Sequence, residues 1–142
     1  MDLTLPIGNI TLNIRVAVVI KTEKGFILEK SNGGYFFVVG GRVKVNETSL
    51  DAAKREMFEE LGLEVLSLKF KATIELFFGY KEEQVQEICF VYESQEINGL
   101  VLGEEFGFYT MSQIYEMDVR PSVIKQVLES NNDTVMHIIE RE

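Results

Sequence analysis

Three glutamates near the middle of the chain have a spacing that suits a cation site. Glu56, Glu59 and Glu60 stand at positions i, i+3 and i+4, so on an α-helix their carboxylates project from one face. Oxygen ligands of this kind suit hard cations such as Mg²⁺ or Mn²⁺, whereas zinc favours nitrogen and sulfur. Like charges this close repel each other, and two of them lie near the helix C-terminus, where the helix dipole disfavours anions. The cluster therefore predicts a compensating divalent cation.

The helix that positions these carboxylates is predicted over residues 49–61. Thr48 suits the N-cap with Asp51 at position N3, and Gly62 suits the left-handed position after the last turn, with Leu63 folding back on it. A separate apolar stripe is formed by Leu50, Ala53, Met57 and Leu61. One face is thus expected to pack while the adjacent face carries negative charge.

The segment before the helix, 38–42, is predicted to be a strand followed by a tight turn at Gly40 and Gly41. Paired glycines allow a positive φ and a close approach to the backbone, so the Gly40 carbonyl could join the carboxylates around a metal. Glu47 precedes Arg55 by eight residues. We expect these two side chains to pair and to hold the loop to the helix.

The spacing over residues 41–63 resembles the Nudix box, G-x5-E-x7-R-E-U-x-E-E-x-G-U with U aliphatic, at every specified position. In this MutT-like pattern Gly41, Glu47, Arg55 and Gly62 have structural roles. The resemblance implies an α/β fold, the Nudix-type α/β/α sandwich, in which a mixed β-sheet packs against the Nudix-box helix and a C-terminal helix. It also implies a metal-dependent hydrolase, often homodimeric, that cleaves the diphosphate bond of a nucleoside diphosphate linked to another moiety X.

Three positions depart from the pattern of many relatives. Val39 stands where many have proline before the paired glycines, and Asn46 stands where many have glycine before the glutamate. Gln86 replaces the histidine of a His-Glu-Ile strand, so any role that needs imidazole is in doubt. None of these changes removes a carboxylate, and we therefore expect the metal site to be retained with an altered loop rigidity.

Site roles follow from the carboxylates and the resemblance together. We expect Glu59 and Glu60 as the main metal ligands, with Glu56 as a ligand or an orienting base. Relatives often bring a carboxylate from a later loop to the metals, which makes Glu104 or Glu105 in the loop 95–105 an alternative general base. The other interpretation of this pair is two solvated loop residues.

Substrate contacts are predicted at two arginines and a group of aromatic residues. Arg15 lies where the strand 11–20 changes from alternation to a continuous apolar run, and it either contacts a phosphate or ribose or is an exposed strand charge. Arg42 is assigned to the same task. Phe78 could stack on a nucleobase, although packing within a hairpin is the commoner fate of such side chains. The same alternatives apply to Phe77 and Tyr80.

The remaining segments fit one mixed α/β domain over residues 1–142. A short edge strand is expected in 3–8, and a strand at 26–29 antiparallel to 11–20. Segments 64–79 and 85–92 should form a hairpin, and the tail should add a strand. Further elements are predicted at 35–39 (strand), 106–109 (strand leading back to the sheet), 112–115 (helical turn) and 121–128 (helix).

Length, composition and net charge restrict the domain organisation, the compartment and the classes of partner that we expect. A chain of 142 residues with 46% hydrophobic residues supports one core rather than two domains. The net charge of −9 argues against extended nucleic-acid binding and favours a small nucleotide substrate. Cys89 lies in an apolar run and is expected to be a buried structural thiol. No apolar stretch reaches the roughly 20 residues that a membrane span needs, so a cytoplasmic protein is expected.

Three other functions remain open at this level. A non-catalytic module on the same fold would bind a nucleotide or a partner protein without metal. A purely structural acidic helix would bind no Mg²⁺, and an RNA-end hydrolase is disfavoured by the acidic surface. Within the enzyme class, the substrate could be a nucleotide sugar, an ADP-ribose-like compound or a nucleoside triphosphate, because the box does not encode substrate choice.

Overall fold

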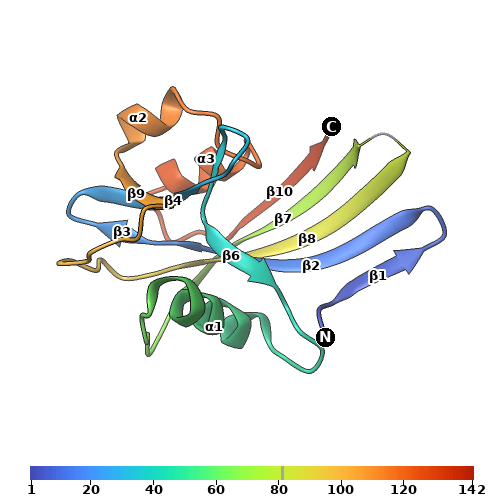
Figure 1. The fold of residues 1–142 in the computed structure, drawn as a ribbon, viewed down its shortest axis with the longest axis horizontal. Helices are drawn as coiled ribbons and strands as arrows, with labels where there is room; N and C mark the ends of the chain where they lie inside the picture. The colour runs from blue at the N-terminus through green and yellow to red at the C-terminus, as the bar shows by residue number, and fades with distance from the viewer. Residues whose placement is uncertain (81) are drawn as a thin grey trace.

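The computed structural model describes residues 1–80 and 82–142, the side chain of residue 80 excepted. It contains two β-sheets with helices on both sides (Figure 1). The larger sheet is built from β1 (Thr4–Ile7), β2 (Ile10–Val19), β6 (Val39–Arg42), β7 (Lys69–Tyr80), β8 (Glu83–Glu93) and β10 (Met136–Arg141). The smaller sheet is built from β3 (Lys21–Thr22), β4 (Gly25–Lys30), β5 (Phe36–Phe37) and β9 (Phe106–Tyr109). The helices are α1 (Ser49–Leu61), α2 (Met111–Tyr115) and α3 (Ile124–Glu129).

The larger sheet is mixed, as predicted. Its strand order is β1-β2-β8-β7-β10, with β6 also paired to β2. The β2–β8 and β7–β10 pairs are parallel, whereas β1–β2, β2–β6 and β7–β8 are antiparallel. The predicted hairpin of β7 and β8 is confirmed with Phe77 opposite Gln86, and the tail adds β10 at the sheet edge.

Alternate residues of β2 face two hydrophobic cores, because successive side chains of a strand point to opposite faces of a sheet. On one face, Val16 and Val18 pack beneath α1 with Ala53 and Met57. The opposite face supplies Ala17 and Val19 to a core completed by α2 and α3; its helical members are Ile114, Ile124, Val127 and Leu128. Figure 1 shows α1 on one side of the larger sheet and α2 with α3 on the other, which confirms the predicted α/β/α arrangement.

Helix α1 has the limits expected from its capping residues. The Thr48 hydroxyl accepts a hydrogen bond from the Asp51 N–H at 3.0 Å. Gly62 adopts the left-handed conformation with φ 69°, and its N–H donates to the Phe58 carbonyl at 2.9 Å. The Leu63 N–H reaches back to the Met57 carbonyl at 3.4 Å. The bond from the Gly62 N–H to the carbonyl four residues back is the αL type of helix end, which only a residue tolerant of positive φ can make without strain.

The predicted strand 35–39 and the tight turn after it are wrong in detail. Strand pairing breaks at Val38, and both glycines lie inside β6, neither of them at a positive φ. Close approach, the second reason for glycine, explains them instead. A Cβ on Gly40 would overlap the Val16 carbonyl oxygen of β2, and a Cβ on Gly41 would overlap the Glu56 carboxylate of α1.

Four other boundaries or pairings differ from expectation. The segment before Lys69 is not a strand, and Leu66 is 96% exposed there, so its alternation is not the mark of a sheet. Strand β4 pairs with β3 and β9 rather than with β2, and β9 therefore belongs to the smaller sheet. Helix α3 begins later than the proline suggests, because the Ile124 N–H closes a turn onto the Pro121 carbonyl at 3.0 Å.

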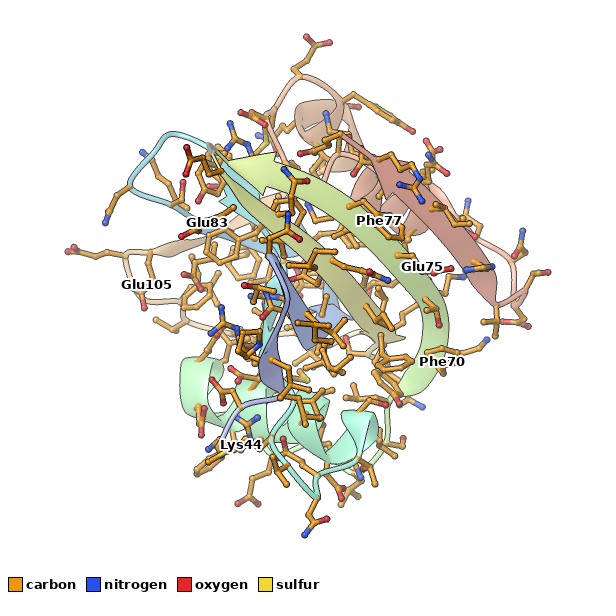
Figure 2. All side chains as sticks on the ribbon, turned by 90° about the vertical axis from the view of Figure 1, so that its right-hand side faces the viewer. Lys44, Phe70, Glu75, Phe77, Glu83 and Glu105 are labelled. Carbon is orange, nitrogen blue, oxygen red and sulfur yellow. The ribbon has the colours of Figure 1, made fainter. Side chains whose placement is uncertain are left out.

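The remaining points concern Cys89, His137 and the question of a membrane span. Cys89 is buried at 7% exposure, and burial raises the pKa of its thiol to about 12, in line with a structural thiol. His137 lies on the edge strand β10, where its ring pairs with Glu75 of β7 (Figure 2). Across the described residues, no helix has both the length and the apolar character needed to cross a bilayer.

Candidate active site

Arg55 joins the loop before α1 to the helix. Its guanidinium donates two hydrogen bonds to Glu47, at 2.7 Å from Nε and 2.9 Å from Nη2, which confirms the predicted pair. Nη2 also donates to the Arg42 carbonyl at 3.0 Å. Pairing with Arg55 lowers the pKa of Glu47 and raises that of the arginine itself. This fork-like contact fixes the loop relative to the acidic face of the helix.

Arg55 also holds two of the three helical carboxylates. Its Nη1 donates to Glu56 Oε1 at 2.9 Å and to Glu59 Oε2 at 3.2 Å. Glu56 is buried, whereas half of the Glu59 side chain is exposed. Within residues 1–80 and 82–142, no three Asp, Glu, His or Cys side chains converge as a ready metal-binding group. The cation that contacts Glu56 and Glu59 is therefore the guanidinium of Arg55, which belongs to the protein itself.

One oxygen of the Glu60 carboxylate has no hydrogen-bond partner among the described groups. This oxygen, Oε2, is buried. Burial, followed by the negative charges of Glu29 and Glu56, raises the pKa of Glu60 to about 8. A carboxylate in this position is costly unless a cation joins it.

Glu29 was missed by the sequence interpretation, although it faces Glu60. It ends the buried part of β4, two residues after Ile27, whose side chain is in the core beneath α1. Alternation along the strand places Glu29 on the same side as Ile27, toward the helix. The alternation of residues along this strand could have pointed to Glu29. That Glu60 lies opposite it could not be known without the fold.

The predicted loop carboxylates differ in their relation to this group. The backbone carbonyl of Glu105 accepts a hydrogen bond from the Lys30 N–H at 2.8 Å, beside the end of β4 (Figure 2). Burial and the nearby negative charge of Glu105 raise the pKa of Glu29. Glu104 is exposed, and none of the contacts among described residues joins it to the group. Both side chains are exposed, and Glu105 is the one of the two whose charge acts on Glu29.

The chemistry of these side chains suits a hard divalent cation, although among the described residues no three of them converge on one point. Glu29, Glu56 and Glu60 supply carboxylate oxygens, and the buried Glu60 oxygen would gain the partner it lacks. Gly41 is the glycine that lets the Glu56 carboxylate lie against β6, whereas Gly40 is packed against the β2 backbone. We refer to Glu29, Glu56, Glu60 and Glu105 as the acidic group.

Two of the departures from the motif have a structural explanation. Asn46 has φ 67°, and it is the non-glycine residue with positive φ in the described part of the chain. Asparagine tolerates this region better than other side chains, so it can replace the usual glycine. Val39 is fully buried in β6, where its side chain contributes to the core beneath α1.

The predicted substrate arginines lie side by side. Arg15 of β2 is directly opposite Arg42 of β6 in an antiparallel register, an arrangement of like charges that destabilises a sheet unless an anion offsets it. Arg15 Nε lies 3.8 Å from Glu87 Oε1 on the neighbouring strand β8. Its positive charge also opposes the rise in the pKa of Glu60. Arg15 therefore lies within electrostatic reach of both Glu87 and the acidic group.

A cavity of about 470 Å³ opens beside Arg15, on the side of the sheet that faces α2 and α3. Arg15 and Phe78, two of the predicted substrate residues, line it together, whereas Arg42 does not. Phe77 is on the opposite face, where the guanidinium carbon of Arg141 lies 4.1 Å from its ring centroid (Figure 2). The prediction for Tyr80 falls outside the described side chains. The cavity also has lining residues that the sequence did not single out: Tyr35, Phe37, Glu87 and Arg120.

Comparison with known proteins gives the family. Residues 11–122 match the NUDIX domain family. A curated relative, the 8-oxo-dGTP diphosphatase of Buchnera aphidicola subsp. Schizaphis graminum, is 34% identical over 70 residues, which cover 46% of this chain and 54% of the relative. The match thus spans about half the length of that relative.

Solved structures share the fold. The mutator MutT protein from Bacillus halodurans superposes with a TM-score of 0.76 at 17% identity, covering 91% of this chain and 89% of that one. The dihydroneopterin triphosphate pyrophosphohydrolase of E. coli gives a TM-score of 0.62 at 18% identity, covering 82% and 92%. With the complete box on α1 and the matching sandwich around it, the chain belongs to the NUDIX domain family.

Proposed function

We propose that the protein is a metal-dependent hydrolase that cleaves the diphosphate bond of a nucleoside diphosphate linked to another moiety X. One observation carries this proposal: the buried, unpartnered oxygen of Glu60 lies among carboxylates within electrostatic reach of Arg15, and Arg15 lines a cavity of 470 Å³. A cation partner for Glu60, an anion partner for Arg15 and an apolar cavity together match the parts of a nucleotide.

The nucleoside part of the substrate would occupy the cavity. Tyr35, Phe37 and Phe78 line it and offer aromatic surface, on which a base gains about 1–3 kcal/mol by stacking. The phosphates would lie beside Arg15, which lines the cavity and stands opposite Arg42 of β6. One guanidinium can bind two phosphate oxygens at once. Such contacts would fix the orientation of the diphosphate beside the acidic group.

Glu56, Glu60 and Glu29 would hold the cation, with the exposed Glu59 as a further ligand or base. Their oxygen-only donor set favours Mg²⁺ or Mn²⁺. When bound, such an ion neutralises phosphate charge and makes bound water more acidic.

A carboxylate of the chain must then take the proton from the attacking water, and Glu105, whose charge acts on Glu29, is the candidate from the loop. The water oxygen bonds to phosphorus as the bridging P–O bond breaks, giving a nucleoside monophosphate and phosphorylated X.

The comparisons support a nucleotide but leave its identity open. The curated relative is named for 8-oxo-dGTP, and a structural neighbour is named for dihydroneopterin triphosphate. Nucleoside triphosphates, including oxidised ones, therefore belong in any substrate panel beside nucleotide sugars and ADP-ribose.

The test is release of phosphorylated products from this panel, with Mg²⁺, with Mn²⁺ and with chelator. Glu60→Gln keeps the shape of the side chain but removes its charge, and should reduce turnover by at least about a hundredfold. Glu64→Gln, at an exposed position just after the helix, is the matched control and should retain wild-type turnover. Metal-independent nucleotide binding without product release would instead favour the non-catalytic module.

Self-association stays a prediction. The resemblance implies a homodimer, and light scattering of the purified protein would distinguish one copy from two.

A further inference from the structure

Glu87 is a buried carboxylate that the proposed chemistry does not use. It is 9% exposed, and its side chain reaches the cavity between the aromatic residues Phe37 and Phe78 and the small side chain of Ala17. It lies on the same face of the sheet as Arg15, away from α1. Burial raises the pKa of Glu87, while Arg15 and Arg42 lower it.

The protein leaves part of the hydrogen-bonding capacity of this carboxylate free. Arg15 Nε is 3.8 Å from Oε1, beyond hydrogen-bonding distance. The Asn13 side-chain amide, directly across on β2, is the neighbour that lowers the pKa of Glu87 by hydrogen bonding. A carboxylate can accept about four hydrogen bonds, so acceptor sites remain that can face the cavity. A buried acceptor with free lone pairs suits a ligand that donates hydrogen bonds.

Glu87 and the two arginines stand on different strands of the larger sheet. Arg15 and Arg42 face each other across β2 and β6, whereas Glu87 stands on β8 between β2 and β7, opposite Leu76. A ligand whose phosphates contact Arg15 would bring its base, rather than its phosphates, to the aromatic walls and to Glu87. The carboxylate is thus placed to contact the edge of a base.

We propose that Glu87 selects the base, and that it selects a guanine-type base whose N1–H and exocyclic amino group donate together to one carboxylate. This inference rests on the proposed function, because it assumes a nucleotide in the cavity. Adenine and cytosine each present one donor beside an acceptor on the corresponding edge, and uracil presents one donor between two acceptors. A carboxylate offers acceptors only, so each of these bases would bring a lone pair against it.

The test is calorimetric titration with the product-like nucleotides GMP and AMP, which differ in the base alone. Wild-type protein should bind GMP at least about tenfold more tightly than AMP, since hydrogen bonds to a charged group are worth roughly 1.5–3 kcal/mol. Glu87→Gln is isosteric and replaces one acceptor by an amino donor, so the ratio should fall to about one. Glu83→Gln, on the exposed part of the same strand, is the matched control and should retain the wild-type ratio.

The ratio distinguishes base selection from support of Arg15. If Glu87 only positions Arg15, Glu87→Gln weakens GMP and AMP equally and the ratio is unchanged, which overturns the inference. A wild-type protein that does not prefer GMP overturns it as well. A GMP preference that Glu87→Gln abolishes, in a protein that releases no product from any nucleotide, would support base selection and refute the proposed hydrolysis.

Discussion

Gly40 and Gly41 are neighbours in sequence, yet alanine at the two positions should damage different properties of the protein. A Cβ on Gly40 would overlap the Val16 carbonyl and lie 3.1 Å from the Cα of Ala17, so it meets the backbone of a central strand. For a Cβ on Gly41, the three nearest atoms all belong to the carboxylate of Glu56. Backbone in the middle of a sheet cannot move aside, whereas a side chain can rotate.

The expected loss of stability depends on which group the new Cβ displaces. Gly40→Ala forces β6 away from β2 and should cost about 3 kcal/mol or more, the upper range for overpacking. Gly41→Ala turns Glu56 away and loses its 2.9 Å hydrogen bond from Arg55, worth roughly 1.5–3 kcal/mol. The lower backbone entropy of alanine in the unfolded chain returns about 0.4–1 kcal/mol. The net cost of Gly41→Ala is therefore about 1–2 kcal/mol.

The assay pairs thermal unfolding in chelator with turnover of the best nucleotide in Mg²⁺. For a chain of this size 1 kcal/mol corresponds to roughly 3–4 °C, so Tm should fall by about 3–8 °C for Gly41→Ala and by about 10 °C or more for Gly40→Ala. Turnover measured well below both transitions should fall at least about tenfold in Gly41→Ala, because a carboxylate of the acidic group is displaced. Equal melting temperatures, or wild-type turnover in Gly41→Ala, would refute this reasoning.

Four further changes probe single contacts. Glu47→Gln should lower the free energy of unfolding by about 2 kcal/mol at pH 7. Because Arg55 lowers the pKa of Glu47 below its ordinary 4.5, the difference in stability between wild type and variant should shrink as the pH falls below 4.5. Denaturant titrations that give a pH-independent difference would contradict the ion pair. Glu60→Gln should raise Tm in chelator by a few degrees, since it removes a buried carboxylate without a partner; a lower Tm would mean that this carboxylate stabilises the metal-free protein. Arg15→Ala should raise KM for the nucleotide roughly tenfold to hundredfold with a smaller effect on kcat, and an unchanged KM in steady-state kinetics would remove Arg15 from the phosphate site. Cys89 should react with a thiol reagent far more slowly in the folded protein than in denaturant, given its burial, whereas equal rates would show an accessible thiol.

Local interactions made parts of the site predictable from sequence. The ends of α1 depend on Thr48 and Gly62, and both act within four residues of their partners. The pair of Glu47 and Arg55 spans eight residues and needed only the assumption of a helix after a loop. Such features are encoded by short spacings, which a fixed motif records in full.

Features that depend on strand pairing were not predictable in the same way. Glu29 comes close to Glu60 only after β4 has taken its place in the fold. Glu87 comes close to Arg15 only after β8 has paired with β2. The two glycines were expected to turn the chain, but their role is to admit a carbonyl and a carboxylate from other segments. A sequence shows that a side chain is small or charged; the register of the sheet decides what it meets.

The most direct test of the account is a titration of Mn²⁺ followed by the electron paramagnetic resonance signal of the free ion. The account predicts saturable binding to the wild-type protein, at least about tenfold weaker in Glu60→Gln and unchanged in the Glu64→Gln control. No saturable binding, or equal affinity in wild type and Glu60→Gln, would contradict the cation site on α1 and the hydrolysis that depends on it.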